Sequence, residues 1–152
     1  NYFPVTHKDM TRFWITLNEG VNFVEKCLSR MVGGEIFVPK IPSIKIVDLA
    51  KAINAKMKIK YTGIRPGEKI HETMCTKDDS QNVLEFKDFF IILPAIQNFG
   101  KSNQLKLRKN KKNLLNEKGK FVKNQFEYNS KYNSYLSILE IRKRLIKNGY
   151  KL

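Results

Sequence analysis

Two short segments carry side chains whose types and spacing could bind a phosphate. The first, residues 10–16, places Arg12 just ahead of a stretch with helical spacing. The second, residues 63–72, reads Gly-Ile-Arg-Pro-Gly-Glu-Lys-Ile-His-Glu, so that Glu68 follows Arg65 by three residues. A guanidinium is planar and bonds phosphate oxygens in two places. The alternative for Arg65 and Glu68 is a surface ion pair, worth under about 1 kcal/mol.

The elements that must position these segments alternate between strand and helix, which predicts an α/β fold. Period-two and β-branched runs predict strands over 2–6, 35–38 and 58–62, and a hairpin over 82–93. Apolar spacing and turn residues predict helices over 17–31, 43–53, 69–74 and 138–148.

Three helix starts are marked by hydroxyl side chains. Thr16 with Glu19, and Ser137 with Glu140, have the spacing of a capping box, and Ser43 can cap the second helix. The first helix also has apolar residues at spacings of 4, 3, 4 and 3, namely Leu17, Val21, Val24, Leu28 and Met31. This spacing predicts a helix with one buried stripe.

Charge divides the 152-residue chain unevenly. The formal net charge is +15, of which residues 1–100 carry +3 and residues 101–152 carry +12. We therefore predict three parts: a lobe over 1–96, a Lys-rich surface loop over 97–126, and a C-terminal segment over 127–152 that ends in a helix. The composition suits one folded domain, and no apolar run approaches the roughly 18 residues that a membrane span requires.

The basic stretch 101–124 leaves a polyanion-binding module open as an alternative. It holds nine Lys or Arg and one acidic residue, Glu117. No aromatic side chain interrupts it from Lys101 to Lys120, whereas proteins that bind single strands interleave aromatics for base stacking. We therefore expect no nucleic acid partner.

A third block, residues 33–43, reads Gly-Gly-Glu-Ile-Phe-Val-Pro-Lys-Ile-Pro-Ser. In order and spacing, this block and the two arginine segments resemble the C-terminal part of the inverting UDP-N-acetylglucosamine 4,6-dehydratases. These enzymes are the polysaccharide-biosynthesis branch of the extended short-chain dehydrogenase/reductases. The resemblance is close over 3–94, weakens across 97–126, and returns at 126–130 and in the final helix.

The resemblance implies the substrate-binding portion of such an enzyme, without its nucleotide-binding Rossmann core. In the family, NADP or NAD is bound by the N-terminal half, which also supplies the catalytic Tyr-x-x-x-Lys pair. This sequence contains neither a G-x-G-x-x-G motif nor a Tyr followed four residues later by Lys. We therefore expect no catalytic residue and no cofactor in this chain alone, and no turnover by it. The function implied is UDP-sugar binding for surface-polysaccharide or flagellin-sugar biosynthesis.

By the same resemblance, Arg12 and Arg65 occupy the positions of two arginines that clamp the UDP diphosphate. Glu68 matches the acidic residue that accepts from the ribose hydroxyls, and the Pro-Gly between Arg65 and Glu68 would fix the turn. Met10 and Thr11 are further substrate-binding candidates, with packing below the site as the alternative. The sequence leaves open a related UDP-hexose dehydratase or epimerase, because the sugar contacts come largely from the other half.

The histidines and cysteines of the sequence predict no further catalytic or metal site. His71 is interpreted as a satisfied helix histidine rather than a general base, and with His7 it makes no plausible metal set. Cys27 and Cys75 are expected to be inert thiols in a reduced, cytoplasmic setting. The partners expected are a UDP-N-acetylhexosamine and, for the full-length enzyme, further copies of itself, with no membrane.

Overall fold

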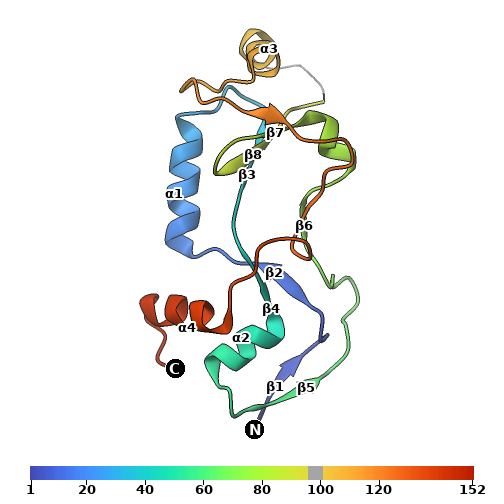
Figure 1. Cartoon of the computed structure of the whole chain (residues 1–152), viewed down its shortest axis with the longest axis vertical. Coiled ribbons are helices and arrows are strands. Elements are labelled where there is room, and N and C mark those ends of the chain that lie inside the picture. Colours follow the sequence, from blue (N-terminus) through green and yellow to red (C-terminus); the bar gives the residue numbers. More distant parts are fainter. Residues whose placement is uncertain (96–100) are drawn as a thin grey trace. The chain divides into compact units, whose positions relative to one another are not determined.

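The computed structural model describes residues 1–95 and 101–152, and within them the chain forms two compact units (Figure 1). Unit 1 comprises Asn1–Trp14, Ile41–Thr73 and Asn129–Leu152, and unit 2 comprises Ile15–Lys40 and Met74–Tyr128. The predicted α/β class is confirmed. The chain passes from one unit to the other four times, so the units do not follow the divisions at 96 and 126 drawn from the sequence.

Unit 1 contains two strand pairs and two helices. The pairs are β1 (Tyr2–Val5) parallel to β5 (Lys58–Tyr61), and β2 (Thr11–Phe13) antiparallel to β4 (Ser43–Lys45). The helices are α2 (Ile46–Ile53) and α4 (Ile138–Lys147). The predicted strands over 2–6 and 58–62 are confirmed.

The core of unit 1 forms where α2 and α4 pack on each other, as Figure 1 shows. Its buried members are Ile44, Ala52, Ile141 and Leu145. The helix α4 begins at the predicted capping box: Glu140 donates its backbone N–H to Ser137 Oγ, and the Glu140 carboxylate accepts from the backbone of Ser137. The capping box therefore fixes the N-terminal end of α4, and the turns that follow it contribute Ile141 and Leu145 to the core.

The start of α2 differs from the prediction. Ser43 does not cap it, because Ser43 lies in β4 and is fully buried. The N-cap is Lys45, which makes no side-chain capping bond. A short strand that pairs with β2 takes the place of the predicted first turn, so tertiary pairing overrides the local capping preference of serine.

Unit 2 contains a four-stranded antiparallel sheet in the order β3-β8-β7-β9. One α-helix precedes β3 in the sequence, and a second lies between β8 and β9. Its elements are α1 (Leu17–Leu28), β3 (Ile36–Pro39), the 3-10 helix η1 (Asp78–Asn82), β7 (Val83–Glu85), β8 (Phe89–Ile92), α3 (Lys101–Asn110) and β9 (Lys120–Phe121). The strands β6 (Thr73–Cys75) and β10 (Tyr128–Asn129) each contain a point where the chain changes unit. The predicted hairpin over 82–93 is confirmed as β7 and β8.

The core of unit 2 is large and aromatic. Its buried members are Leu84, Phe86, Phe89, Ile91, Leu93 and Leu107. Leu84 and Ile91 face each other across β7 and β8, and the rings of Phe86 and Phe89 stack with centroids 4.8 Å apart. Unit 2 is therefore held by a core of its own.

The segment predicted as a surface loop over 97–126 contains regular structure. Residues 97–100 lie outside the described part of the chain. Beyond them, α3 buries Leu107 in the core at 1% exposure, and β9 extends the sheet by pairing with β7. The lysines around Leu107 hide the helical period that would have shown this helix in the sequence.

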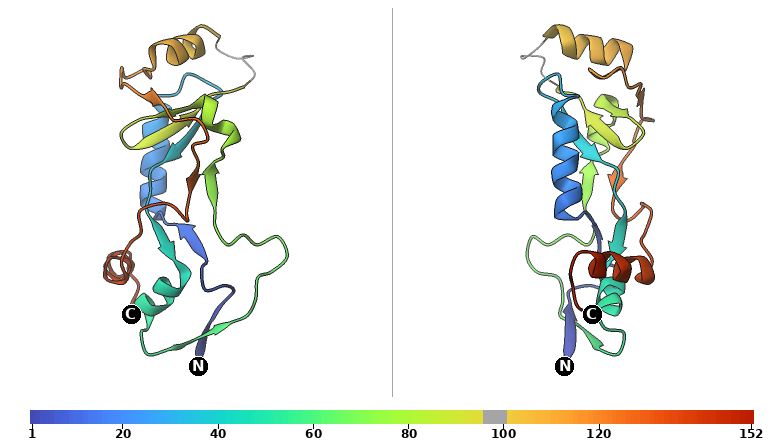
Figure 2. Two further views of the ribbon diagram at one scale, coloured as in Figure 1. Left: turned by 45° about the vertical axis from the view of Figure 1, so that its right-hand side comes forward. Right: turned by 90° about the vertical axis from the view of Figure 1, so that its left-hand side faces the viewer.

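The helix α1 starts at its predicted capping box, but its predicted buried stripe is wrong. All five stripe residues are exposed: Leu17 83%, Val21 49%, Val24 60%, Leu28 64% and Met31 44%. The helix instead packs Phe23 against the core of unit 2, and Figure 2 shows α1 beside the sheet. It therefore has a second apolar face that no described part of unit 2 covers.

The helix predicted over 69–74 is absent. Residues 70–71 form a bend, and β6 begins at Thr73. The backbone N–H of Thr11 donates to Ile70 O at 2.9 Å, so this segment follows the free edge of β2 rather than coiling. His71 is therefore not a helix residue, contrary to the prediction.

Candidate functional site

The strand β2 is held on both edges and positions two of the predicted residues. Thr11 stands opposite Lys45 and Arg12 opposite Ile44 on β4, while the Thr11 N–H bonds Ile70 on the other side. Successive side chains of a strand point to opposite faces. Arg12 and Thr11 therefore leave β2 on opposite faces.

Arg12 is anchored by the loop that follows the Arg-Pro-Gly-Glu turn. Its Nη1 donates to Thr11 O at 2.7 Å and to Ile70 O at 3.2 Å, and its Nη2 donates to Lys69 O at 2.8 Å. Its Nε lies 3.6 Å from Glu72 Oε1. A guanidinium has five N–H donors, so the carbonyls use three, and the Nε–H and one Nη2 N–H remain in a fixed orientation.

The turn from Arg65 to Glu68 has the conformation that its sequence predicts. The Glu68 N–H donates to Arg65 O at 3.0 Å, and Gly67 has φ +78°. Proline then glycine with positive φ is typical of a type II turn. The Glu68 carboxylate closes the turn, because Oε2 accepts from the Arg65 N–H at 3.1 Å and Oε1 accepts from Thr6 Oγ at 3.2 Å.

The Arg65 guanidinium, by contrast, has no protein partner. The side chain is exposed, and within residues 1–95 and 101–152 it forms no hydrogen bond or ion pair. Arg65 and Glu68 therefore do not form the surface ion pair that was the alternative. The structure places Glu68 in the same loop that Arg12 anchors, and no described contact joins Arg12 to Arg65.

Met10 and Thr11, the two further candidates, are buried at 4% and 3% exposure. The Met10 sulfur accepts from Thr6 Oγ at 3.3 Å, and the Met10 carbonyl accepts from the N–H of Ile46. Both side chains are therefore largely buried, and their contact with a ligand stays a prediction.

A hydrogen-bonded chain around Thr11 escaped the sequence reasoning. Thr11 Oγ1 lies 2.9 Å from His71 Nδ1 and 2.7 Å from Ser130 Oγ, and Ser130 Oγ accepts from the Glu72 N–H at 2.9 Å. Burial lowers the pKa of His71, as do the nearby charges of Lys131 and Arg12. Ser130 lies 119 residues from Thr11, and no local pattern in the sequence connects them.

The comparison with family models now bears on this geometry. The model for polysaccharide biosynthesis proteins matches residues 1–94, which include β2, the Arg65–Glu68 turn and His71. The chain belongs to the polysaccharide biosynthesis protein family.

Relatives of this chain include curated enzymes. An inverting UDP-N-acetylglucosamine 4,6-dehydratase of Campylobacter jejuni is 48% identical over 130 residues, which are 86% of this chain and 37% of the relative. A UDP-glucose 4-epimerase of Rickettsia canadensis is 35% identical over 92 residues, 58% of this chain and 27% of the relative. The chain thus spans little more than a third of the length of the curated dehydratase.

A solved structure, of Pen from Bacillus thuringiensis, superposes with a TM-score of 0.72 at 27% identity. The match covers 97% of this chain and 41% of the Pen chain. The arrangement described above therefore also occurs as part of a longer protein.

The described residues of this chain offer no dinucleotide site. Dinucleotides bind parallel β-α-β units through a glycine-rich loop. The described strands β1 and β5 pair in parallel, but the sequence has no G-x-G-x-x-G. NAD or NADP therefore does not fit the residues present, and no reaction step is assigned to this chain.

The described residues contain no group of three or more His, Cys, Asp or Glu that could hold a metal ion. None of their helices is long and apolar enough to cross a membrane.

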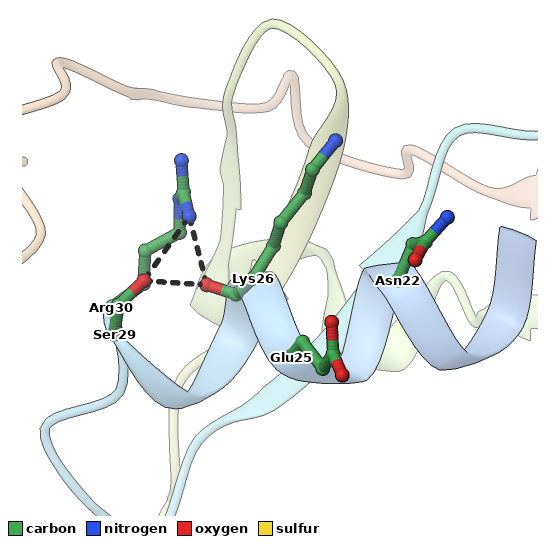
Figure 3. A pocket seen from close by; sticks show the side chains of 5 residues that line it. All are labelled: Asn22, Glu25, Lys26, Ser29 and Arg30. Carbon is green, nitrogen blue, oxygen red and sulfur yellow. Dashed lines mark hydrogen bonds between the residues drawn. The ribbon is translucent and has the colours of Figure 1, made fainter.

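A shallow pocket on α1 contains polar groups that bond to one another (Figure 3). Arg30 Nη1 donates to Lys26 O at 2.8 Å and to Ser29 Oγ at 3.3 Å, and Ser29 Oγ donates to Lys26 O at 3.0 Å. Arg30 also makes a two-point ion pair with Glu117, with both distances 2.7 Å. These contacts close the C-terminal end of α1 and fix Arg30 within unit 2.

Proposed function

We propose that this chain is the C-terminal, UDP-sugar-binding part of a UDP-N-acetylglucosamine 4,6-dehydratase/5-epimerase of surface-polysaccharide or flagellin-sugar biosynthesis. The family match and the 48% identity to the Campylobacter dehydratase support the class of reaction. The proposed ligand contacts are Arg12, Arg65 and Glu68, with Met10 and Thr11 supporting them from below.

The observation that carries the proposal is the unpaired guanidinium of Arg65 on a fixed turn. A structural arginine uses its donors on the protein, as Arg30 does with Glu117. Arg65 has its backbone held by Glu68 while its guanidinium is free among the described residues. The turn fixes the backbone that carries this side chain, and its planar fork can bond diphosphate oxygens in two places.

Arg12 and Glu68 would assist in different ways. Arg12 keeps the second N–H of Nη2 after anchoring the loop and pairing its Nε with Glu72, and this donor can reach a phosphate oxygen with no loss of the anchor. Each oxygen of the Glu68 carboxylate has a lone pair left after its described bond. The carboxylate can therefore accept from ribose hydroxyls while it closes the turn.

The chain alone would bind but not react. NAD or NADP and the catalytic residues would belong to an N-terminal half, which also completes the sugar site, and the full-length enzyme would be a homo-oligomer. A cytoplasmic location fits the two free thiols of Cys27 and Cys75. The second candidate is a related UDP-hexose epimerase, which the resemblance to the Rickettsia 4-epimerase favours; both candidates use the same UDP contacts.

The test is UDP binding by the 152-residue chain, measured calorimetrically at low salt. Arg65→Ala should weaken binding by about tenfold or more, because a charge-assisted two-point contact is lost. The UDP affinity of Arg65→Lys should lie between those of wild type and Arg65→Ala, since lysine keeps the charge and loses the planar fork. Lys56→Ala is the matched control, because Lys56 is exposed in unit 1 and its side chain has no described partner.

The outcomes separate clearly. Loss of affinity in Arg65→Ala with an unchanged Lys56→Ala supports the proposal. Equal UDP affinity in wild type and Arg65→Ala, or no saturable binding by wild type, overturns it.

A further inference from the structure

Unit 1 has an open pocket of about 570 Å³. Of the residues proposed for UDP contact, only Thr11 lines this pocket, at its base. Its walls come from the loop after β1, the β4–α2 junction, the bend at 70–71 and the segment 131–135. Its charged and titratable members are Lys8, Lys45, Lys51, Lys131, His7, His71, Asp9 and Asp48. Four lysines against two carboxylates give the pocket a formal charge of +2 with both histidines neutral.

The four ammonium groups have no acidic partner. None of them forms an ion pair or hydrogen bond within residues 1–95 and 101–152. Lys45 lies over the ring of Tyr135 at 5.7 Å from its centroid, and Lys131 lies over Tyr132 at 5.0 Å. The carboxylate of Asp9 lies 4.0 Å from His7 Nδ1 rather than beside a lysine.

The wall that carries Lys131 is rigidly built. Tyr135 donates its hydroxyl to Ser130 O at 2.9 Å and to Lys131 O at 2.8 Å. Asn133 donates to Ile41 O and to Ser43 Oγ, at 2.7 and 3.0 Å. Lys131 therefore projects from backbone that is tied to the body of unit 1.

The hydrogen-bonded chain beneath the pocket orients His71. Ser130 Oγ accepts from the Glu72 N–H, and its contact to Thr11 Oγ1 at 2.7 Å is shorter than its contact to Thr11 O at 3.4 Å. This favours a chain in which Ser130 donates to Thr11 and Thr11 donates to His71 Nδ1. A neutral His71 then carries its proton on Nε2, which has no other described partner and is a donor available to the pocket.

The pocket is separate from the proposed UDP contacts. It lies on the Thr11 face of β2, and Arg12 leaves the strand on the opposite face. Neither Arg65 nor Glu68 lines it.

We propose that this pocket is a second anion site, which binds a phosphate dianion through Lys45, Lys131 and the Nε2–H of His71. Lysines without an acidic partner that line one concave surface favour an anion there. A dianion matches the formal charge of +2, and phosphate offers three acceptor oxygens for the separate donors. The dianion is either inorganic phosphate or a phosphomonoester of a small metabolite.

The experiment is a titration of the 152-residue chain at low salt, first with inorganic phosphate and then with a hexose phosphomonoester. The double variant Lys45→Ala/Lys131→Ala should weaken phosphate binding by about tenfold or more, and Lys56→Ala should leave it unchanged. Followed by NMR, phosphate should raise the pKa of His71 in wild type, because a bound dianion favours the imidazolium. This rise should be lost in the double variant.

The two ligands identify the source. Tighter binding of the ester assigns the pocket to a phosphorylated metabolite, and equal binding assigns it to phosphate itself. No saturable phosphate binding by wild type, or equal affinity in the double variant, overturns the proposal. Arg65→Ala distinguishes this site from the proposed function: it should bind phosphate as wild type does while it loses UDP, and loss of both would overturn the separation.

Discussion

The two units use their cations differently. In unit 2, Arg30 is paired with Glu117, and Lys40 and Lys120 both reach Glu85, at 2.9 and 3.2 Å. In unit 1, Arg65 and the lysines around the pocket have no acidic partner among the described residues. Cations paired within the protein stabilise its fold, whereas unpaired cations fixed at one surface are available to an anion. Under the proposed function, the contacts to the anion lie in unit 1.

The net charge of the sequence does not show this difference between the units. The excess of basic residues over 101–124 drew attention to a polyanion, but part of it is used within unit 2. Lys120 pairs with Glu85, and Arg108 Nη2 donates to Asn82 Oδ1 at 3.0 Å. The pocket of unit 1 is lined by unpaired lysines from the less basic first hundred residues and by Lys131. Net charge alone therefore does not show which cations are paired within the protein.

The largest expected effect is on the core of unit 2. Leu84 is fully buried, and Leu84→Ala should lower the free energy of unfolding by about 3 kcal/mol, measured by urea denaturation. Leu114→Ala, at 54% exposure, is the matched control and should change it by less than about 0.5 kcal/mol. UDP affinity per folded molecule should be unchanged in both. A loss of UDP affinity in folded Leu84→Ala would break the assignment of ligand chemistry to unit 1.

The next effect separates the two arginines of unit 1. Arg12→Ala removes three hydrogen bonds to backbone carbonyls and should cost about 2 kcal/mol of local stability. Amide exchange over 69–72 should become faster, and UDP affinity should fall as well. Arg65→Ala should lower UDP affinity without changing this exchange, because its guanidinium anchors nothing. Equal exchange in the two variants would show that Arg12 does not position the loop.

A smaller effect is expected at the ion pair of unit 2. The hydrogen bond from Arg30 lowers the pKa of Glu117. A lowered folded-state pKa adds stability above the unfolded value, near 4.3, and this stability is lost as pH falls through the folded value. The Glu117 side chain is 39% exposed, so solvent screening limits the gain to about 0.5–1 kcal/mol.

The measurement is the pH dependence of the melting temperature of Glu117→Gln against wild type. The difference between the two should be largest near neutral pH and should shrink below pH 4. A difference in melting temperature that persists unchanged to pH 2 would mean that the variant does not act by removing the ion pair between Arg30 and Glu117.

The smallest effect concerns the two faces of α1. Val24→Ala should change stability by less than about 0.5 kcal/mol, because Val24 is 60% exposed. Phe23→Ala, one residue away, should cost clearly more, because Phe23 packs on the core of unit 2. Thermal denaturation of the two variants gives the comparison. A larger loss of stability in Val24→Ala than in Phe23→Ala would support the buried stripe that the sequence predicted.

Local signals in the sequence predicted the local structure well. The capping boxes at Thr16 and Ser137 form as expected, and the turn at Arg65 has the conformation that Pro66 and Gly67 require. These features depend on residues within three or four positions of one another. The helix expected over 69–74 failed because that segment bonds to β2, some sixty residues earlier in the chain.

The candidate site shows the same limit. The sequence, through its family resemblance, predicts Arg12, Arg65 and Glu68 as ligand contacts, but it could not show which of the arginines is anchored. Nor could it connect Thr11 with Ser130, because their contact exists only in the folded chain. The exposed stripe of α1 was missed because spacing shows that a face is apolar and does not show whether anything covers it.

The central claim is that the unpaired arginine of unit 1 binds the diphosphate while the paired cations of unit 2 do not. The most direct test is UDP titration of two single variants side by side, Arg65→Ala from unit 1 and Lys120→Ala from unit 2. The account predicts at least a tenfold weaker affinity in Arg65→Ala, by roughly 1.4 kcal/mol or more, and the wild-type affinity in Lys120→Ala. Equal affinities in the two variants would contradict it.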